Sequence, residues 1–372
     1  MRVALLARRF DPSGGGTERD LMVTIDCLRA GGHSVNVYAD EIRGSLPGLE
    51  LHRVGSTKLP KTLAFIRFAY AGASMARRDG TDLVLSFARV ANADVLRSGG
   101  SAHASYLRAA RRWRGAVGAM AMSAAPYHRA QVIIERRGFT SPRLKGAIAV
   151  SQFVRRDLIA RFELAPSLVT TIYNGVDLER FRPDMAETRS HVRREFGIPE
   201  SAAMVTFVGH GFARKGLGFL IEAFAMLKSD RYLLVVGNDR AVDAFRRRAD
   251  ARGVGSRVIF AGSRPAIERF FNAADALALP SLFEPFGNVA LEAMACGIPV
   301  LVSSQCGVAE ILPSAMREFV VERPEDPSEL ASKLDAILQR REELSAAARA
   351  AAVEFTWERH ARELNRLLES LK

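Results

Sequence analysis

Two glutamates eight residues apart, Glu284 and Glu292, are the first candidates for chemistry in this sequence. Glu284 lies in a loop rich in proline and glycine after a predicted strand at 276–279, and Glu292 lies in the helix predicted next. Because ligands bind beyond the carboxyl ends of the strands in an open α/β sheet, we expect both carboxylates to face a ligand. A carboxylate within that helix suits a vicinal diol such as a ribose. The alternative is that Glu284 caps the helix and Glu292 is a solvated helical residue.

The residues between the two glutamates would open this helix and present its unpaired N–H groups to the ligand. Such donors suit sugar hydroxyls and a phosphate, because a helix N-terminus attracts negative charge. The residues concerned are Phe286, Gly287, Asn288 and Val289.

A basic pair forms the second candidate group. Arg214 and Lys215 lie in the turn 209–216, directly after the predicted strand Met204–Val208. Arginine can hold a phosphate through two parallel hydrogen bonds and lysine adds a compact positive charge, so the pair suits a diphosphate. The alternative is a solvated basic turn, which would not require the glycines that flank this pair.

A glycine-rich turn, Gly14–Gly16, follows the first predicted strand, Val3–Ala7, and precedes a predicted helix at 18–31. Glycines in this position let backbone N–H groups approach an anion. Glu18 and Asp20, in the first turn of that helix, would oppose a tightly held dinucleotide. The turn therefore indicates either a phosphate contact or only a tight connection from strand to helix.

These candidates need a scaffold of parallel strands, and the sequence predicts two such scaffolds. Short apolar runs alternate with longer amphipathic stretches, which is typical of a doubly wound α/β fold, and the alternation starts again in the second half. Proline and glycine cluster near 165–185, where two domains are expected to join. We predict one Rossmann-like domain over 1–168, a second over 169–356, and a terminal helix at 357–372 that packs back on the first.

The 372-residue chain has a net charge of +12, and the basic excess lies in its first half. Residues 1–185 hold 28 lysines and arginines against 16 acidic residues, whereas 186–372 hold 25 of each. A basic half can attract nucleic acid, an anionic membrane or a phosphorylated substrate. Nucleic-acid binding would require aromatic residues interleaved with the basic ones, and aromatics make up only 8% of the chain. We expect no nucleic-acid partner; a basic Rossmann-type regulatory protein is the alternative from another class.

Cysteine use and hydropathy limit the environment. The three cysteines, Cys27, Cys296 and Cys306, match no metal-binding or CxxC spacing and are expected to be reduced core thiols. No apolar run reaches the roughly 18 residues that a membrane span needs. The short run at the N-terminus ends at Arg8 and Arg9, which argues against a signal peptide. We therefore expect a cytoplasmic protein, either free or peripheral on a membrane.

The sequence resembles the retaining GT-B glycosyltransferases of family GT4. These carry a Glu-x7-Glu motif, which Glu284 and Glu292 match within FEPFGNVALEAMACGIPV. The likeness covers nearly the whole chain, and other matching segments are GGG at 14–16, NGVD at 174–177, GHGFARKG at 209–216, VVG at 235–237 and FAGSR at 260–264. Within the family the chain looks most like lipopolysaccharide-core enzymes of the heptose-specific glucosyltransferase I type, on GGTERD at 15–20 and GFARKGL at 211–217. The resemblance implies a GT-B fold, in which two Rossmann-like domains face a cleft.

The resemblance also implies an activity. The family moves a hexose from a nucleotide-sugar donor, here expected to be a UDP-sugar, to a lipopolysaccharide-core or related glycolipid or saccharide acceptor. It does so with retention of configuration and with neither a metal nor another cofactor. The alternative is a transferase of another cell-envelope or exopolysaccharide pathway that uses a GDP- or other nucleotide-sugar. A GT-B nucleotide-sugar epimerase or phosphorylase is a nearer rival than the basic nucleic-acid-binding or regulatory protein.

Residue roles follow from the same resemblance. Glu292 would bind the ribose hydroxyls, while Arg214 and Lys215 would hold the diphosphate and stabilise the leaving group. Glu284 would position the donor sugar, and Arg264 would contact the base. The remaining donor contacts would come from Gly15 and Gly16 in the first domain and from Phe286, Gly287, Asn288 and Val289 in the second.

Three further residues are candidates in the first domain. His103 follows another glycine turn, and in many family members a histidine near this place contacts the donor sugar or the acceptor. The glucosyltransferase I branch lacks this histidine, so the match to that branch is incomplete. The alternative is a solvated histidine at a helix start. Asp20 and Asp94 are weaker acceptor-side candidates, and each could instead be a cap or a surface charge.

The segment 105–125 is predicted to be a helix that docks on the cytoplasmic face of an anionic inner membrane. Trp113 suits the interface, and arginines suit anionic lipid. The alternative is that the segment packs against its own domain and its arginines are ordinary surface charge. The basic and apolar residues that motivate this prediction are Arg108, Arg111, Arg112, Arg114, Val117, Met120 and Met122.

Overall fold

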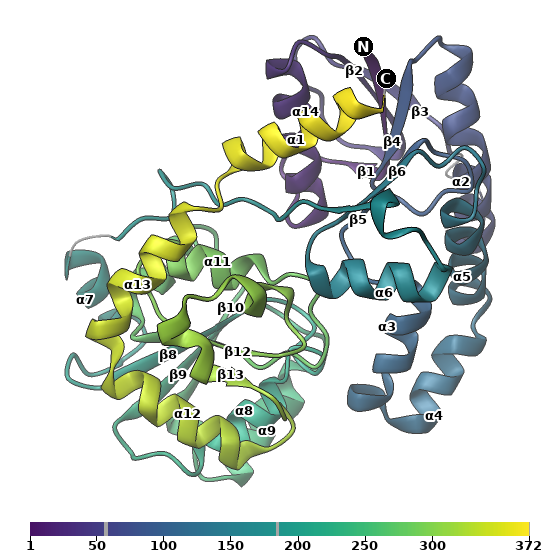
Figure 1. Ribbon diagram of the computed structural model, residues 1–372. Coiled ribbons are helices and arrows are strands. Elements are labelled where there is room, and N and C mark those ends of the chain that lie inside the picture. Colours follow the sequence, from purple (N-terminus) through teal and green to yellow (C-terminus); the bar gives the residue numbers. More distant parts are fainter. Residues whose placement is uncertain (56–58, 184–185, 372) are drawn as a thin grey trace. The chain divides into compact units, whose positions relative to one another are not determined.

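The computed structural model describes residues 1–55, 59–183 and 186–371 and divides into two compact units. The first unit comprises Met1–Asn174 together with the C-terminal segment that begins at Trp357, and the second comprises Gly175–Thr356. The division falls at Asn174, six residues after the boundary expected from the sequence. Each unit is built on one parallel sheet, so the predicted pair of doubly wound α/β folds is confirmed (Figure 1).

The first unit holds a seven-stranded sheet with the order β3-β2-β1-β4-β5-β6-β7. Its strands are β1 (Arg2–Phe10), β2 (Ser34–Ile42), β3 (Glu50–Arg53), β4 (Leu83–Ser86), β5 (Val95–Ser98), β6 (Gly146–Ala149) and β7 (Val169–Thr171). The chain runs outward from β1 through β2 to β3 and then returns to β4 on the other side of β1. The order of the strands therefore reverses between β1 and β4, and a ligand site is expected beyond their carboxyl ends.

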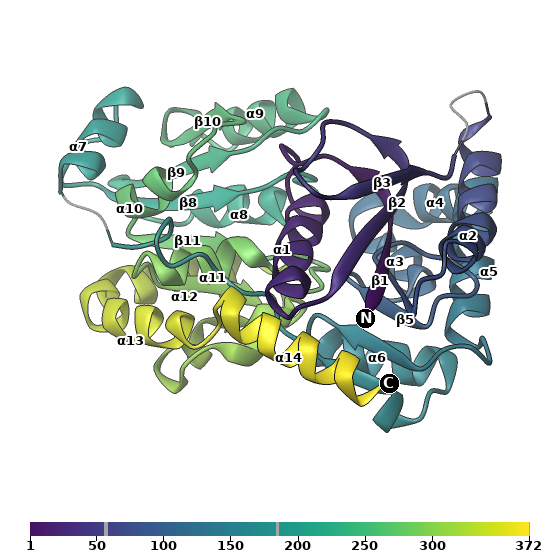
Figure 2. The ribbon, with the colours of Figure 1, turned by 90° about the horizontal axis from the view of Figure 1, so that it is seen from above.

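Helices cover both faces of this sheet. Their bounds are α1 (Thr17–Ala30), α2 (Lys61–Arg78), α3 (His103–Ala109), α4 (Arg111–Ala124), α5 (Pro126–Phe139), α6 (Gln152–Phe162), the short 3-10 helix η1 (Pro166–Leu168) and α14 (Trp357–Ser370). Helices α1 and α2 lie on opposite faces (Figure 2). Ser151 caps α6 by accepting a hydrogen bond from the backbone N–H of Val154, as short polar side chains do at helix starts.

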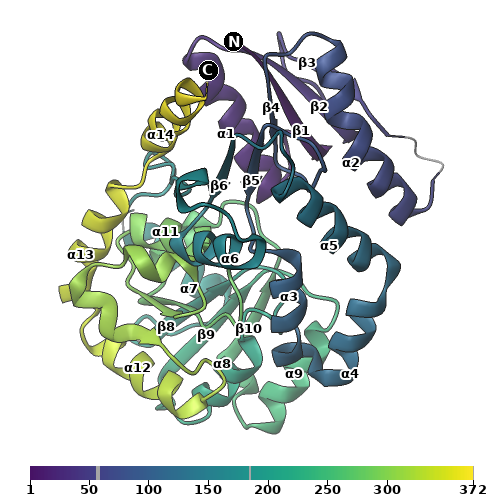
Figure 3. The same cartoon turned by 45° about the vertical axis from the view of Figure 1, so that its right-hand side comes forward.

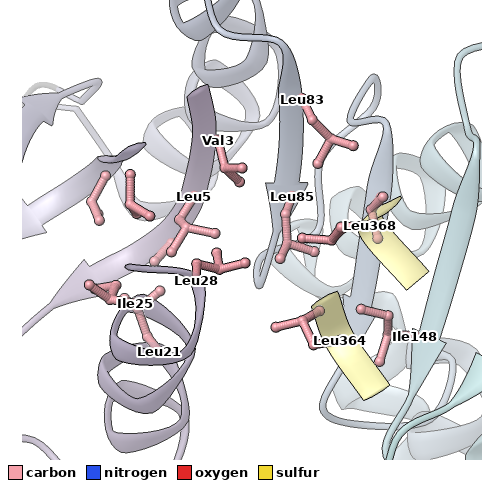
Figure 4. Packing of buried hydrophobic residues seen from close by; sticks show 14 of the residues in the cluster. Val3, Leu5, Leu21, Ile25, Leu28, Leu83, Leu85, Ile148, Leu364 and Leu368 are labelled. Carbon is pink, nitrogen blue, oxygen red and sulfur yellow. The ribbon is translucent and has the colours of Figure 1, made fainter. Parts of the chain in front are cut away.

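The terminal helix α14 belongs to the core of the first unit. Leu364 and Leu368 of α14 are buried in the same cluster as Leu5 of β1 and Leu28 of α1 (Figure 4). The buried apolar residues of α1 recur at helical spacing and face β1, as the amphipathic pattern of this stretch predicts. The C-terminal end of the described chain thus lies with the N-terminal sheet.

The second unit holds a six-stranded parallel sheet with the order β10-β9-β8-β11-β12-β13. Figure 2 labels β10, β9, β8 and β11 of this sheet. Its strands are β8 (Ala203–Val208), β9 (Arg231–Val236), β10 (Val258–Gly262), β11 (Ala276–Leu279), β12 (Val300–Ser303) and β13 (Val320–Val321). Its helices are α7 (Ala186–Glu195), α8 (Leu217–Phe224), α9 (Val242–Ala251), η2 (Gly255–Arg257), α10 (Glu268–Ala273), α11 (Asn288–Ala295), η3 (Gly307–Ile311), η4 (Ser314–Phe319), α12 (Pro327–Gln339) and α13 (Arg341–Val353). Here the strand order reverses between β8 and β11.

A buried ion pair fastens α7 to this sheet. The guanidinium of Arg193, which is fully buried, lies 2.9 Å from a carboxylate oxygen of Asp275. The same oxygen accepts a hydrogen bond of 2.7 Å from the backbone N–H of Met204. Arg189 binds the other oxygen of Asp275 at 2.7 Å. The carboxylate is therefore fully engaged, which is how a buried charge becomes tolerable.

The segment 105–125 is not the continuous helix that the sequence predicts. It spans most of α3 and all of α4, and Gly115 within α4 has φ 70° and ψ 173°, which breaks the helix there. Within the described residues, no helix combines the length and the apolar character needed to cross a membrane. The three cysteines are buried and unpaired with one another, as expected.

Candidate functional site

The two loops that carry the predicted donor-binding residues meet at the place where the strand order reverses in the second unit. Arg214 and Lys215 follow β8, and Glu284 follows β11, the neighbouring strand. The backbone N–H of Leu282 donates a hydrogen bond of 2.8 Å to the carbonyl of Arg214, which joins the two loops. The structure therefore brings these three predicted residues together at the expected end of the sheet.

One carboxylate holds both cations. The ammonium of Lys215 lies 2.7 Å from Oε2 of Glu284, and the guanidinium of Arg214 lies 3.0 Å from the same oxygen. Arg214 also donates a hydrogen bond of 2.6 Å to the carbonyl of Phe283. Burial would raise the pKa of Glu284, but the nearby charges of Lys215 and Arg214 outweigh it and lower the pKa to about 2. The group is thus ionised at neutral pH and carries a net charge of one positive.

Glycines make the close approach of these loops feasible. Gly209 has φ 140°, and a Cβ there would lie 2.6 Å from Cε of Lys215. Gly216 has φ 80°, and a Cβ there would lie 2.1 Å from the carbonyl oxygen of Pro280. A side chain at Gly209 would displace Lys215, and one at Gly216 would push the two loops apart. The glycines are therefore needed for the close packing of the loops, which a merely solvated turn would not require.

Helix α11 begins at Asn288, directly after Gly287, which occupies the N-cap position. The loop before it is held to the segment after β12: the carbonyl of Glu284 accepts a hydrogen bond of 3.0 Å from Gly307, and that of Phe286 accepts one of 2.7 Å from Val308. Phe286 is buried, whereas Asn288 and its neighbour Val289 are partly exposed at the helix start. The predicted helix opening is therefore where the sequence placed it.

Glu292 lies in the second turn of α11 and is largely buried. A solvated helical glutamate, which was the alternative, does not fit this burial. Arg264 follows β10 and is exposed; it donates a hydrogen bond of 2.9 Å to the carbonyl of Ala261. Its guanidinium lies over the ring of Phe196 and 3.6 Å from a carboxylate oxygen of Glu195. Arg264 is thus held by Ala261, Phe196 and Glu195. Within the described part of the chain, it makes no contact with Arg214, Lys215 or Glu284.

In the first unit the glycine turn leads into α1 as expected. Gly15 and Gly16 are exposed, and Gly16 adopts φ 59° at the N-cap of α1. The two acidic candidates have other partners. Asp20 is buried and lies 3.1 Å from the guanidinium of Arg97, and Asp94 accepts hydrogen bonds from Arg77 at 2.9 Å and from the backbone of Val84 at 2.8 Å. These contacts give both carboxylates structural partners, and their role on the acceptor side stays a prediction.

His103 begins α3 and is buried, so the alternative of a solvated histidine is wrong. Its ring nitrogen Nε2 lies 2.9 Å from Nδ1 of His128, and its backbone N–H donates a hydrogen bond of 2.6 Å to Glu135. Burial, together with the positive charge of Arg89 and the nearby His128, lowers the pKa of His103 to about 3. The imidazole is therefore neutral over the physiological range.

A pocket in the first unit contains residues that the sequence analysis did not select. It has a volume of about 290 Å³ and lies beyond the carboxyl ends of β1 and β4, where the strand order reverses. Arg8, Arg9 and Arg89 line it, together with the aromatic rings of Phe65 and Tyr127. Arg89 is held 2.7 Å from Glu135, the same carboxylate that binds the backbone of His103.

A sequence signal for these arginines existed. Arg8 and Arg9 directly follow the first predicted strand, Val3–Ala7, and Arg89 lies three residues after the end of β4. Such positions are the ones that the α/β rule selects. Among the described residues, no group of three or more histidine, cysteine, aspartate or glutamate side chains is arranged to hold a metal ion.

The two units match the models of two glycosyltransferase families. Residues 14–180 match "Glycosyltransferase Family 4", and residues 188–354 match "Glycosyl transferases group 1". A D-inositol 3-phosphate glycosyltransferase of Geodermatophilus obscurus is 33% identical over 256 residues, which are 65% of this chain and 55% of that protein. The chain spans about half the length of the curated relatives that it matches.

Solved structures resemble the whole chain. WaaG, a glycosyltransferase involved in lipopolysaccharide biosynthesis, has a TM-score of 0.82 and 25% identity, with 98% of this chain and 99% of that chain covered. HepE of Anabaena, solved in complex with UDP and glucose, has a TM-score of 0.76 and 19% identity over the full length of both chains. These likenesses confirm the predicted GT-B fold.

Proposed function

The chain belongs to the group 1 and family 4 glycosyltransferases of the GT-B fold, and we propose that it transfers a hexose from a UDP-sugar to a glycolipid acceptor. The acceptor is a lipopolysaccharide-core or related saccharide, and the transfer retains the anomeric configuration without a metal ion. The single observation that carries the proposal is the group of Arg214, Lys215 and Glu284 at the carboxyl ends of β8 and β11.

Charge explains how this group would act. When the bond between the sugar and the diphosphate breaks, its electron pair passes to a phosphate oxygen, so negative charge grows there. The net positive charge of Arg214 and Lys215 over Glu284 stabilises that oxygen in a largely buried setting, where electrostatic interactions are strong. Glu284 orients both cations before the donor arrives, which avoids the cost of ordering them during the reaction.

The remaining donor contacts come from α11. Its N-terminal turn presents backbone N–H groups, which suit the sugar hydroxyls or a phosphate oxygen. We assign the vicinal hydroxyls of the ribose to Glu292, the carboxylate that lies largely buried in the second turn of α11. The acceptor hydroxyl attacks the anomeric carbon on the face that the diphosphate leaves, and the departing phosphate oxygen accepts the hydroxyl proton. This geometry accounts for retention without a covalent enzyme intermediate.

We assign the acceptor to the pocket of the first unit that Arg8, Arg9 and Arg89 line. Aromatic rings of this pocket suit the apolar face of a sugar, and the arginines suit its hydroxyls and any phosphate. His103 then acts as a positioning residue, since its backbone holds Glu135, and Glu135 holds Arg89. Because the acceptor is anchored in a membrane, the first unit docks on the anionic cytoplasmic face of that membrane.

The donor is open to direct measurement. Because HepE was solved with UDP and glucose, UDP-glucose is the first donor to test. A donor that binds the folded protein raises its unfolding midpoint in proportion to the logarithm of its concentration. We expect UDP-glucose to stabilise the protein more than GDP-mannose or ADP-glucose does, with no dependence on EDTA. A larger effect of a GDP- or ADP-sugar would reject the UDP assignment, and a requirement for a divalent metal would reject the metal-free mechanism.

A further inference from the structure

A large apolar groove lies in the first unit between α3, α4 and α5, away from the pocket that Arg89 lines. Its volume is about 830 Å³, within the range of cavities that bind small molecules. Leu107 and Ala119 form part of its buried lining. The residues that line the groove belong to α3, α4, α5 and α6, and none belongs to a strand. Figures 1 and 3 show α3 and α4 off the sheet.

The rim of the groove exposes large apolar side chains. Val117 of α4 is 76% exposed, Met120 of α4 is 68% exposed and Ile133 of α5 is 53% exposed, and all three line the groove. The break at Gly115 permits this arrangement, because it separates the arginine-rich first turn of α4 from the apolar turns that follow. Apolar side chains gathered around one concave surface mark a binding site rather than scattered surface residues.

Four arginines surround this apolar surface: Arg108, Arg111, Arg129 and Arg161. No aspartate or glutamate lines the groove, and none of the four forms an ion pair with the residues that the structure describes. Elsewhere in the unit, by contrast, Arg77, Arg89 and Arg97 each have a carboxylate partner within 3.1 Å. The groove is therefore apolar within and positively charged around its edge.

We infer that this groove binds one acyl chain of an anionic phospholipid from the bilayer, with the headgroup phosphate held by the surrounding arginines. An acyl chain matches the apolar lining, and only an acidic headgroup compensates four unpaired cations. The inference rests on the proposed membrane association and makes it specific. In this mode one acyl chain leaves the bilayer and enters the groove of the protein. Simple adsorption, by contrast, would need only surface charge and an interfacial helix.

A monomeric lipid separates these two modes, because it offers no bilayer to adsorb on. The probe is dihexanoyl phosphatidylglycerol below its critical micelle concentration, compared with dihexanoyl phosphatidylcholine. Trp113 follows Arg111 by two residues and reports on binding by fluorescence; Trp357→Phe removes the second tryptophan of the chain. We expect saturable binding of dihexanoyl phosphatidylglycerol at one site per protein. Dihexanoyl phosphatidylcholine should bind at least tenfold more weakly.

Matched substitutions test the groove itself. Met120→Ser should weaken binding of the glycerol lipid about tenfold, whereas Met226→Ser should not change it, since Met226 is similarly exposed at 61% but lies in the second unit. Arg111→Gln should weaken binding about fivefold. Arg114→Gln, on the same helix but outside the groove, should have a clearly smaller effect. All four side chains are largely exposed, so the variants should fold.

The outcomes distinguish this inference from the proposed function. Binding to anionic vesicles without binding to the monomeric lipid would overturn the groove, and so would equal losses in Arg111→Gln and Arg114→Gln. In either case stabilisation by UDP-glucose would persist, and the transferase proposal would stand. Conversely, selective lipid binding without any response to a nucleotide-sugar would support the groove and reject the proposed reaction.

Discussion

Lys215 and Arg214 share a single oxygen of Glu284, and this arrangement defines what each residue contributes. A cation that stabilises the leaving diphosphate acts most strongly in the transition state, where the negative charge is greatest. We therefore predict that Lys215→Ala lowers kcat on the order of 100-fold or more, with a smaller change in donor KM. Arg214→Ala should behave similarly. Steady-state kinetics with saturating acceptor measure this, and a wild-type kcat in Lys215→Ala would show that the phosphate assignment is wrong.

Glu292 should show the opposite pattern. Contacts to a ribose are the same in the ground state and in the transition state, so their loss weakens binding without slowing the bound complex. We predict that Glu292→Ala raises the Kd for UDP-glucose at least tenfold, while kcat at saturation falls much less. Isothermal titration gives the Kd. The matched control is Glu222→Ala, which removes a glutamate of α8 that pairs with Arg248 of α9. This variant should bind UDP-glucose normally.

The sequence could place two of the proposed donor residues in one site, because both lie in a glycine-bearing loop directly after an apolar strand. Lys215 and Glu284 both meet this description. The roles of Asp20 and Asp94 could not be inferred in this way, since the partner of Asp20 is Arg97, 77 residues along the chain. A carboxylate neutralised by a distant arginine looks the same in a sequence as one that faces a ligand. The position of Arg89 after a strand is visible in the sequence, whereas its pairing with Glu135 is visible only in the folded chain.

At the scale of elements, alternating apolar and amphipathic stretches predicted most of the strands and helices around both sites. Two of the strands that the sequence did not predict interrupt that pattern. β5 carries the buried Arg97 within a short apolar run, and β3 is a polar edge strand, Glu50–Arg53. The prediction of one continuous helix over 105–125 was wrong. Gly115 adopts a backbone conformation that is incompatible with a helix, so the helix is interrupted there. Local periodicity shows amphipathic character but not a break of this kind.

The attachment of α7 to its sheet gives a prediction about stability. Asp275→Ala would leave the buried guanidinium of Arg193 without its carboxylate, and breaking a buried pair in this way costs about 3–5 kcal/mol. Urea unfolding of the variant should show this loss. Asp335→Ala is the control, because Asp335 meets Arg231 near the surface and such pairs contribute at most about 1 kcal/mol. Equal and small losses in both variants would mean that the pair does not hold α7 in place.

For the whole molecule, the positive charge and the proposed acceptor pocket belong to the same half. The basic excess lies before residue 186, and the first unit contains both the arginine-lined pocket and the apolar groove. A membrane-anchored, phosphorylated acceptor would be attracted by such a half. Fold and family could be predicted from the sequence because the motifs extend over both halves. The proposed acceptor pocket could not be predicted, since its lining residues come from separate strands and helices.

Stereochemistry tests the reaction as a whole. Attack on the face that the diphosphate leaves must give a product with the same anomeric configuration as the donor. We predict an α-linked product from UDP-glucose, whose donor linkage is α, in proton NMR spectra recorded at early times. A β-linked product would mean direct displacement from the opposite face and would exclude the proposed mechanism.

The most direct test of the central claim is the release of UDP from UDP-glucose with and without a lipopolysaccharide inner-core glycolipid. A transferase should form UDP and glycosylated lipid in equal amounts, both depending on the acceptor, and Lys215→Ala should lose both together. Mass spectrometry of the lipid and a coupled assay of UDP give the two quantities in one reaction. UDP release at the same rate without acceptor, or unchanged activity in Lys215→Ala, would contradict the account.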